Sequence, residues 1–482
     1  MLFNSFEYII FFPLIVLFYF SSKNIKTRTT ILLIGSYIFY ASWNPVYLVL
    51  LLFSTTTSFL LSKLIHKSDG RRKDLFLYFA IFLSLILLFY FKYYNFIARN
   101  LQFIIDRLHL PLEVIEHSWL LPVGISFYTF QIVGYLIDVA KGRIEPEKSY
   151  NTYSLYVSFF PQLVAGPIER ATQLLPQLKK IHRLNYNNFS NGFRLILWGF
   201  FKKLVVADRF ALYVNQIYND PESYSGMPIV MATIFFVFQV YCDFSAYSDI
   251  AIGSARVLGI ELMENFKGPL LSKNVTEIWR RWHISLSTWI RDYLYNPILI
   301  KTRHWEKKGL VFTLILTFSM VGIWHGAEWT FVIFGFVHGL ALTYELLSKK
   351  TRKKWRKHVP KVVYNSLSIA ITFIFWSATC LLFRANNLHD ASTLLTNIFV
   401  SAENSWNANI FTDPKDITQF KISLGILIFM ILFHFVEYKK DATEFFNHKS
   451  IVVRVILYLM VGISIPIFGA FNAGQQFIYF QF

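Results

Sequence analysis

Long runs of hydrophobic residues alternate with short polar segments along most of the chain. A transmembrane helix needs about 20 mostly apolar residues. Runs near that length occupy residues 2–20, 75–91, 120–139, 228–245, 330–347, 362–382, 420–436 and 452–471. The run 309–323 is shorter, and 31–65 is long enough for two spans that turn at Pro45, which lacks a backbone donor. The pattern predicts an all-α polytopic membrane protein with roughly ten or eleven transmembrane helices.

Two apolar regions do not fit this pattern. The first, 153–167, ends in a Gly-Pro pair and returns to a basic segment, so we expect it not to cross the membrane. The second, 274–300, has an apolar stripe at positions i, i+3, i+7 and i+10, formed by Trp279, Trp282, Leu286 and Trp289. With arginines among these residues, the stripe predicts an amphipathic helix at the membrane interface or a re-entrant element that lines a cavity.

Charged residues gather between the hydrophobic runs. The segment 349–361 carries eight Lys or Arg residues and no acidic residue, and the segments 23–28, 71–73 and 439–440 are also basic. Because the cytoplasmic loops of membrane proteins are rich in Lys and Arg, we place these segments in the cytoplasm. The stretch 385–419 is poor in basic residues and carries four acids, so it faces outward. Counting spans between these anchors predicts that both termini are extracytoplasmic.

The composition indicates a single membrane domain over residues 1–482. Apolar residues make up 55 % of the chain and charged residues 16 %, whereas soluble domains have about 25 % charged residues. The net charge of +18 lies mostly in the loops, so it fits membrane orientation and argues against nucleic-acid binding. Cys242 and Cys380 lie in apolar runs and are interpreted as buried thiols, so we expect no disulfide framework and no metal site.

One histidine stands out because ionisable groups at membrane depth are costly and tend to be functional. His325 follows an apolar run, and Gly322 and Gly326 beside it allow a break in the helix and the close approach of a substrate. A neutral imidazole there would take the proton of a hydroxyl that attacks a thioester. Flanking aromatic residues such as Trp324 would exclude water. The alternative is a structural histidine bonded to a neighbouring helix.

Other polar residues are candidates for supporting roles. His283 would orient the base, or would bind a phosphate-bearing donor together with Arg280 and Arg281; alternatively it anchors the helix at the interface. Asp243 lies where the predicted span 228–245 ends. Asp243 would pair with one of these arginines or fix a histidine tautomer. For His338, in the middle of an apolar run, we expect a hydrogen bond between helices.

Seven runs spread over the chain carry a family pattern: 121–131, 159–168, 241–247, 279–295, 324–329, 383–385 and 477–482. Together they resemble the membrane-bound O-acyltransferase family, in the branch of the alginate O-acetyltransferase membrane subunit. The resemblance implies that His325 matches the essential histidine of the family and His283 its second preserved histidine. It also implies helices around a central funnel or tunnel, where a cytoplasmic acyl donor meets an acceptor from outside.

The resemblance further implies a separate extracytoplasmic acetyltransferase partner and a polysaccharide acceptor. Alginate-type relatives usually have a Tyr-Arg-Gly run where this chain has Ala140-Lys141-Gly142, so the polymer stays open.

The leading hypothesis is therefore an O-acetyltransferase of the bacterial cytoplasmic membrane. It would use acetyl-CoA or another acyl thioester as donor substrate and have no bound cofactor. His325 would be the general base, His283 would assist it, and Arg280 and Arg281 would steer the phosphates of the donor. A related alternative is D-alanyl transfer to teichoic acid. An alternative of another class is a transporter or scaffold without chemistry of its own.

Overall fold

The computed structural model describes residues 1–400, 414–439, 450–471 and 477–478, and these residues form helices joined by turns and loops. The chain divides into two compact units. Unit one comprises residues 1–196 and 248–263, and unit two comprises 197–247 and 264–482. We describe each unit separately.

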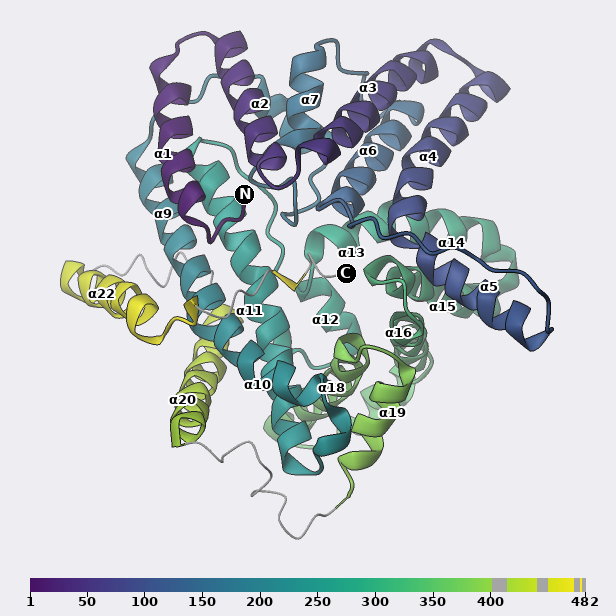
Figure 1. The fold of residues 1–482 in the computed structure, drawn as a ribbon, viewed down its shortest axis with the longest axis vertical. Helices are drawn as coiled ribbons and strands as arrows, with labels where there is room; N and C mark the ends of the chain where they lie inside the picture. Colours follow the sequence, from purple (N-terminus) through teal and green to yellow (C-terminus); the bar gives the residue numbers. More distant parts are fainter. Residues whose placement is uncertain (401–413, 440–449, 472–476, 479–482) are drawn as a thin grey trace. The chain divides into compact units, whose positions relative to one another are not determined.

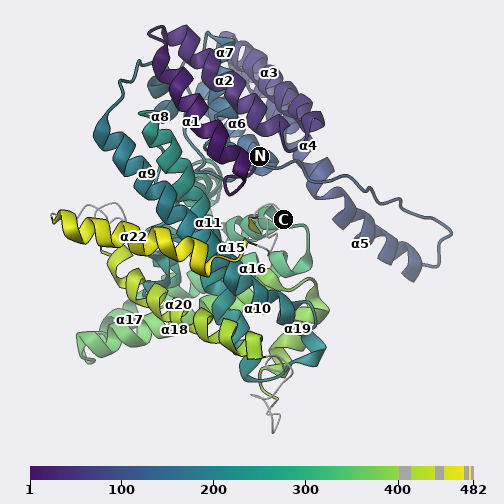
Figure 2. The ribbon, with the colours of Figure 1, turned by 60° about the vertical axis from the view of Figure 1, so that its left-hand side comes forward.

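Unit one contains most of the N-terminal helices. They are α1 (Phe6–Ser21), α2 (Ile25–Ala41), α3 (Pro45–Lys67), α4 (Gly70–Lys92), α5 (Tyr94–Arg107), α6 (Ile125–Ala140), α7 (Tyr150–Ser158), α8 (Ala171–Leu178) and most of α9 (Tyr186–Phe200). Helices α2, α3, α4, α6 and α7 pack as a bundle, and α5 extends away from it (Figures 1 and 2). The predicted turn at Pro45 is confirmed, because α2 ends at Ala41 and the Asn44 side chain caps the start of α3.

The apolar region 153–167 is buried within unit one. Its helix α7 has nine residues, far fewer than a membrane crossing requires. The hydroxyl groups of Tyr153 and Ser58 are 2.8 Å apart, and the Gln131 amide donates to the backbone oxygen of Tyr156. These contacts tie α7 to α3 and α6, so the expectation that this region does not cross is confirmed.

Unit two contains the remaining helices. Before the C-terminal half they are η1 (Phe201–Ala207), α10 (Asp208–Tyr218), η2 (Pro221–Ser223), most of α11 (Met227–Val257), η3 (Pro269–Leu271), α12 (Val275–Arg281), α13 (Ile284–Ile290), η4 (Arg291–Tyr295), α14 (Asn296–Thr302) and η5 (Arg303–Trp305). The long helices follow: α15 (Glu306–His325), α16 (Trp329–Leu347), α17 (Lys349–Trp355), α18 (Lys361–Arg384), α19 (Leu388–Asn397), α20 (Pro414–Glu437) and α22 (Ile451–Phe468).

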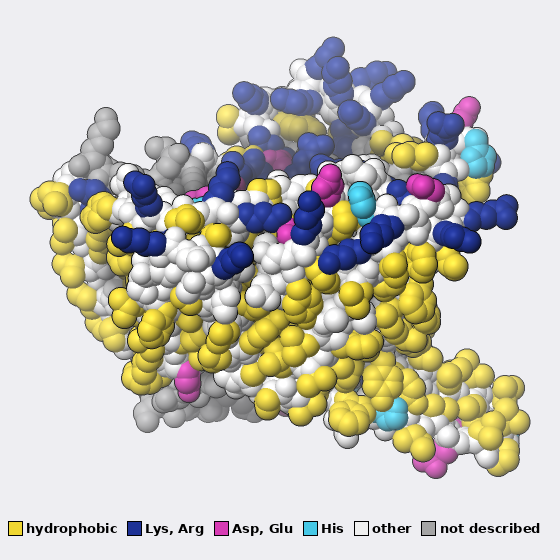
Figure 3. All heavy atoms as spheres, turned by 90° about the horizontal axis from the view of Figure 1, so that it is seen from above, with side chains coloured by type: hydrophobic (Ala, Val, Ile, Leu, Met, Phe, Trp, Pro, Cys, Tyr) yellow, Lys and Arg dark blue, Asp and Glu magenta, His cyan; other side chains and the backbone are white. Residues whose placement is uncertain are grey.

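Eight helical stretches within the described residues are long and apolar enough to cross a membrane. They are Pro45–Lys67, Gly70–Lys92, Met227–Val257, Ile284–His325, Trp329–Leu347, Lys361–Arg384, Ile417–Glu437 and Ile451–Phe468, and two shorter apolar helices are Phe6–Ser21 and Ile125–Ala140. On the face seen in Figure 3, hydrophobic side chains cover a broad area and many Lys and Arg side chains gather beside it. The prediction of an all-α polytopic membrane protein is confirmed.

Helices α15 and α16 form a tight hairpin because glycines face each other across it. A Cβ atom added to Gly322 would come within 2.8 Å of the Cα atom of Gly335. The ring of Phe331 occupies the corresponding space beside Gly326. The predicted role of these glycines in substrate approach is therefore wrong for Gly322, which permits close packing of two helices instead.

Two other local predictions are corrected by the structure. Asp243 does not lie at the end of a span, because α11 continues without interruption to Val257. The region 274–300 is not one amphipathic helix at the interface. It breaks into several short helices, and His283 has a positive φ of 46° at the first break. Its tryptophans Trp279, Trp282 and Trp289 are buried. The other prediction for this region, an element that lines a cavity, is confirmed.

Candidate active site

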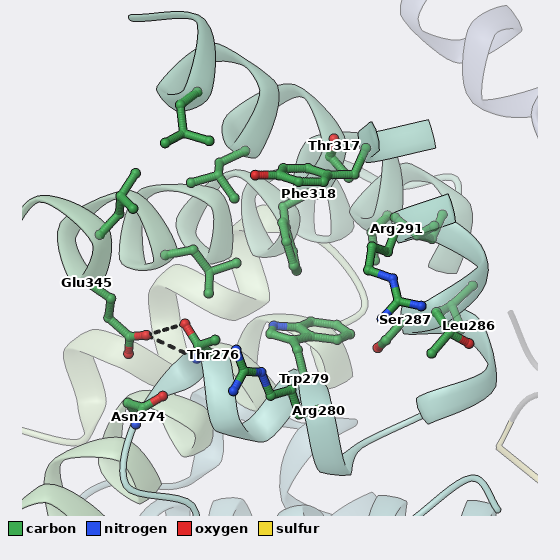
Figure 4. A pocket seen from close by; sticks show the side chains of 18 of the residues that line it. Asn274, Thr276, Trp279, Arg280, Leu286, Ser287, Arg291, Thr317, Phe318 and Glu345 are labelled. Atoms are coloured by element: carbon green, nitrogen blue, oxygen red, sulfur yellow. Dashed lines mark hydrogen bonds between the residues drawn. The ribbon is translucent and has the colours of Figure 1, made fainter. Parts of the chain in front are cut away.

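A cavity of about 870 Å³ lies inside unit two, between the short helices that begin at α12 and the α15–α16 hairpin (Figure 4). Trp279 of α12 and Phe318 of α15 pack edge to face in its wall, with their ring centroids 5.2 Å apart. The end of α16 and the start of α17 contribute further lining residues. The cavity is large enough for a drug-sized ligand, which typically occupies about 300–1,000 Å³.

One face of α15 forms a long wall of this cavity. Leu310, Leu314, Thr317 and Val321 line it at intervals of three or four residues, which places them on one side of the helix. His325 follows Val321 by four residues and so continues the same side. Because a helix rises 1.5 Å per residue, His325 lies about 6 Å further along the axis than Val321. The cavity thus extends along α15 toward the histidine.

The lining of the cavity is strongly basic. Its four cationic side chains are Arg280, Arg291, Lys349 and Arg352. The lining also contains one acidic side chain, Glu345, which is bound to the start of α12. Its carboxylate accepts hydrogen bonds from the backbone N–H of Val275 at 2.6 Å and from the hydroxyl of Thr276 at 2.6 Å. Carboxylates are favoured at helix N-termini. The excess of positive charge suits an anionic ligand.

His325 lines a second, much smaller chamber of about 20 Å³. The imidazole is 4 % exposed. Seven other residues from four helices and the α12–α13 junction form the chamber wall: Val240, Trp279, Trp282, Phe334, Trp376, Cys380 and Phe383. Trp279 lines both this chamber and the large cavity. The indole of Trp279 is therefore a wall that the chamber and the basic cavity share.

Aromatic rings surround the imidazole of His325. The nearest ring centroids are those of Trp324 at 4.9 Å, Phe383 at 5.3 Å and Phe334 at 6.0 Å. Apolar walls of this kind exclude water, so an imidazole base would act on a bound hydroxyl in preference to solvent. The predicted water-poor surroundings of His325 are confirmed.

The position of Trp279 depends on two buried hydrogen bonds. Its indole N–H donates to Nδ1 of His338 at 3.3 Å, and Nε2 of His338 lies 3.2 Å from the hydroxyl of Thr379. Since Nδ1 accepts, the proton of His338 is on Nε2, which donates to Thr379. The two bonds join α12, α16 and α18. The predicted hydrogen bond of His338 between helices is confirmed.

His283 and His325 share one aromatic neighbour, Trp324. The indole of Trp324 is 6.0 Å from the imidazole of His283 and 4.9 Å from that of His325. Nδ1 of His283 donates to Oδ1 of Asn265 at 3.2 Å, so its second nitrogen, Nε2, carries the lone pair. Complete burial lowers the pKa of His283 to about 3. An interfacial anchor is excluded by this burial, and Trp324 lies between the two histidines as a supporting residue.

The other predicted site residues, Arg280, Arg281 and Asp243, do not lie together in the structure. Arg280 lines the cavity, whereas Arg281 bonds to Glu277 at 3.0 Å and lies 4.0 Å over the ring of Tyr438. Arg281 is therefore not among the lining residues of the cavity. Asp243 is bound to a lysine outside the site, so the predicted pairing with Arg280 or Arg281 is wrong.

That lysine belongs to a buried ionic cluster that sequence reasoning missed. Nζ of Lys203 lies 2.8 Å from both Asp243 and Asp208. The second oxygen of Asp243 accepts the backbone N–H of Ile478 at 2.7 Å, and Lys203 lies over the ring of Phe477. The signal was present in the sequence, since Lys203 interrupts an apolar run at 195–207. The cluster fixes residues 477–478 to η1 and α11 within unit two.

The fold and the site define a multi-pass membrane protein that holds a buried imidazole beside a basic, ligand-sized cavity. The sequence model of the membrane-bound O-acyltransferase (MBOAT) family matches residues 147–385 of this chain. The chain belongs to this family and is an O-acyltransferase. The resemblance deduced from the sequence is thereby confirmed, and a transporter or scaffold without chemistry is excluded.

Relatives with assigned activities cover most of the chain. A probable alginate O-acetylase of Pseudomonas putida is 31 % identical, over 98 % of this chain and 98 % of its own length. A peptidoglycan O-acetyltransferase of Helicobacter pylori is 35 % identical, over 76 % of this chain and 72 % of its own. A teichoic acid D-alanyltransferase of Bacillus subtilis is 28 % identical, over 61 % of this chain and 74 % of its own.

Proposed function

We propose that this protein transfers an acetyl group from acetyl-CoA to a hydroxyl acceptor, for O-acetylation of an exported or cell-envelope polysaccharide. His325 is the general base. The observation that carries the proposal is the buried imidazole next to a basic cavity of about 870 Å³, with Trp279 as their common wall. The names of the two acetylating relatives, which refer to alginate and to peptidoglycan, support a glycan acceptor.

The large cavity is the donor site in this proposal. Acetyl-CoA is a polyanion joined to a long, uncharged arm that ends in the thioester. Its phosphates match the basic side chains of the lining, and its arm follows the apolar face of α15 from Leu310 to Val321. Lys349 and Arg352 belong to the basic segment 349–361, which the positive-inside rule places in the cytoplasm. The donor thus enters from the side on which it is made.

The reaction at His325 is an acyl transfer without a covalent enzyme intermediate. The acceptor oxygen attacks the thioester carbonyl carbon while the imidazole takes the hydroxyl proton. The carbon–sulfur bond then breaks, and the imidazolium returns the proton to the departing thiolate. His283 stays neutral because of its low pKa. It assists through Trp324, whose indole contacts both imidazoles.

The acceptor reaches the site from the outer face. We place the chain in the bacterial cytoplasmic membrane with both termini extracytoplasmic, as the distribution of basic loops predicts. A separate extracytoplasmic acetyltransferase would deliver the acetyl group to the polysaccharide.

A substitution of the base tests the proposal. His325→Ala is expected to abolish glycan acetyl esters, measured by mass spectrometry of the extracted polymer, while the protein still inserts in the membrane at normal levels. The matched control is His389→Ala, which removes an exposed histidine of α19. Normal acetylation by His325→Ala would remove the assignment. Alanyl esters in place of acetyl esters in the wild type would favour the teichoic acid reaction of the 28 % identical relative.

A further inference from the structure

We infer that the small chamber beside His325 limits the length of the acyl group and so restricts the enzyme to two-carbon acyl donors. This inference rests on the proposed function, because it assumes that a thioester reacts at His325. Its basis is the size and chemistry of the chamber, which holds about 20 Å³ beyond Trp279. The large cavity binds the donor, and the chamber determines which acyl groups of a bound donor can react.

The volume of the chamber corresponds to one small group. A cavity needs a volume of about 10–15 Å³ to hold one water molecule. A methyl group is of similar size to a water molecule. The methyl of an acetyl thioester therefore fills the chamber when the carbonyl carbon is beside His325. A propionyl or butyryl chain requires additional space of one or two methylene groups.

The wall of the chamber cannot easily provide that space. Phe334, Trp376 and Cys380 are each at most 4 % exposed. The indole of Trp376 packs against Trp282 and His338 at 5.1 and 5.5 Å, and Trp279 is held by His338. Close-packed interiors resist such displacement, because an added methylene forces neighbouring side chains out of their preferred rotamers. Longer chains are therefore excluded by packing.

The chemistry of the wall also disfavours a charged acyl group. Val240, Cys380 and aromatic side chains form it together with His325. A D-alanyl group carries an ammonium, and burial of an ammonium without a partner anion is strongly unfavourable. The chamber therefore selects acetyl over D-alanyl as well as over longer chains.

The test compares acyl-CoA donors of different length with the full-length protein in membrane vesicles. Acetyl-, propionyl- and butyryl-CoA are supplied to the cytoplasmic face, and acyl esters on the extracted glycan are measured by mass spectrometry. The wild type is expected to prefer acetyl over propionyl by about tenfold or more, the discrimination typical of one methylene in an apolar pocket. Val240→Ala and Val240→Ala/Cys380→Ala enlarge the chamber and should reduce this preference severalfold.

The matched control is Val237→Ala, on the same helix and fully buried but outside both cavities. It removes the same atoms and should leave the preference for acetyl unchanged. Equal use of all three donors by the wild type, or an equal shift in the Val237 variant, would overturn the inference and leave the proposed function intact. A wild type that forms no acyl ester with any donor would instead contradict the proposed function. The preference of the wild type among the three donors tests the inference even if a variant with an enlarged chamber does not fold.

Discussion

The indole N–H of Trp279 donates a hydrogen bond to Nδ1 of His338, with 3.3 Å between the nitrogens. This bond holds the ring that lines both the large cavity and the chamber of His325. His338 is itself fixed by Thr379 on α18. His338, which is outside the lining of both cavities, thus positions the indole that the two cavities share.

The first prediction concerns this shared wall. Trp279→Ala removes the indole and opens the chamber of His325 to water, so acetyl-CoA hydrolysis should rise relative to acetyl transfer. The measurement is the ratio of CoA released to acetyl esters formed. Trp279→Phe keeps an aromatic wall and loses only the bond to His338, so it should fall between the wild type and the alanine variant. A constant ratio across the series would show that Trp279 does not exclude water from the chamber.

The second prediction distinguishes two adjacent arginines. Arg280 lines the cavity and Arg281 does not. Losing one ion contact of about 1 kcal/mol should raise the KM for acetyl-CoA about fivefold in Arg280→Gln. Arg281→Gln is the matched control and should leave this KM near the wild-type value.

A donor without phosphates sharpens that comparison. S-acetylpantetheine carries the same thioester but no nucleotide, so its KM should be insensitive to Arg280→Gln. If the substitution raises the KM for both donors equally, Arg280 acts on the fold of α12 and not on donor phosphates.

The third prediction concerns the ionic cluster of Lys203, Asp208 and Asp243, whose side chains are 1–6 % exposed. Removing one member of a buried ion pair costs about 3–5 kcal/mol because the remaining charge is uncompensated. Lys203→Met leaves two facing carboxylates, so it should lower the thermal unfolding temperature in detergent more than Asp243→Asn does. The surface pair of Arg256 and Glu261 provides the control, and Glu261→Gln should change stability by less than about 1 kcal/mol.

The fourth prediction is a pH dependence of stability. Burial raises the pKa of Glu169 in unit one to about 8, although the N–H of Met263 and the charge of Arg170 oppose the shift. The folded state therefore binds this proton more tightly than the unfolded chain does. Its contribution is fully present below the usual carboxyl pKa of 4.5 and is lost as the pH rises through about 8.

Thermal unfolding at pH 5.5 and 8.5 measures this effect. The unfolding temperature of the wild type should fall between the two pH values by more than that of Glu169→Gln, which keeps an acceptor for Met263 and cannot ionise. Glu145→Gln, at an exposed position of the same unit, should behave like the wild type. An identical fall in all three proteins would mean that Glu169 does not titrate in this range.

The sequence by itself determined the membrane class and the leading histidine. Long apolar runs have few structures available in a bilayer, because every backbone polar group must be bonded internally. The helices from α2 to α22 therefore largely follow the hydrophobic pattern, and an ionisable group such as His325 stands out within it. The family pattern that identified an acyltransferase is likewise a property of the sequence.

Only the tertiary structure decided which residues share the site. Val240, Trp279, Phe334 and Trp376 meet around His325 from four different helices, and spacing along the chain carries no information on such contacts. Periodicity placed Trp279 on a continuous amphipathic stripe, but the structure breaks this region at His283, and Trp279 lines the cavity from α12. Neighbours such as Arg280 and Arg281 separate for the same reason: adjacent residues on a helix point in different directions, and packing alone fixes which of them faces the cavity.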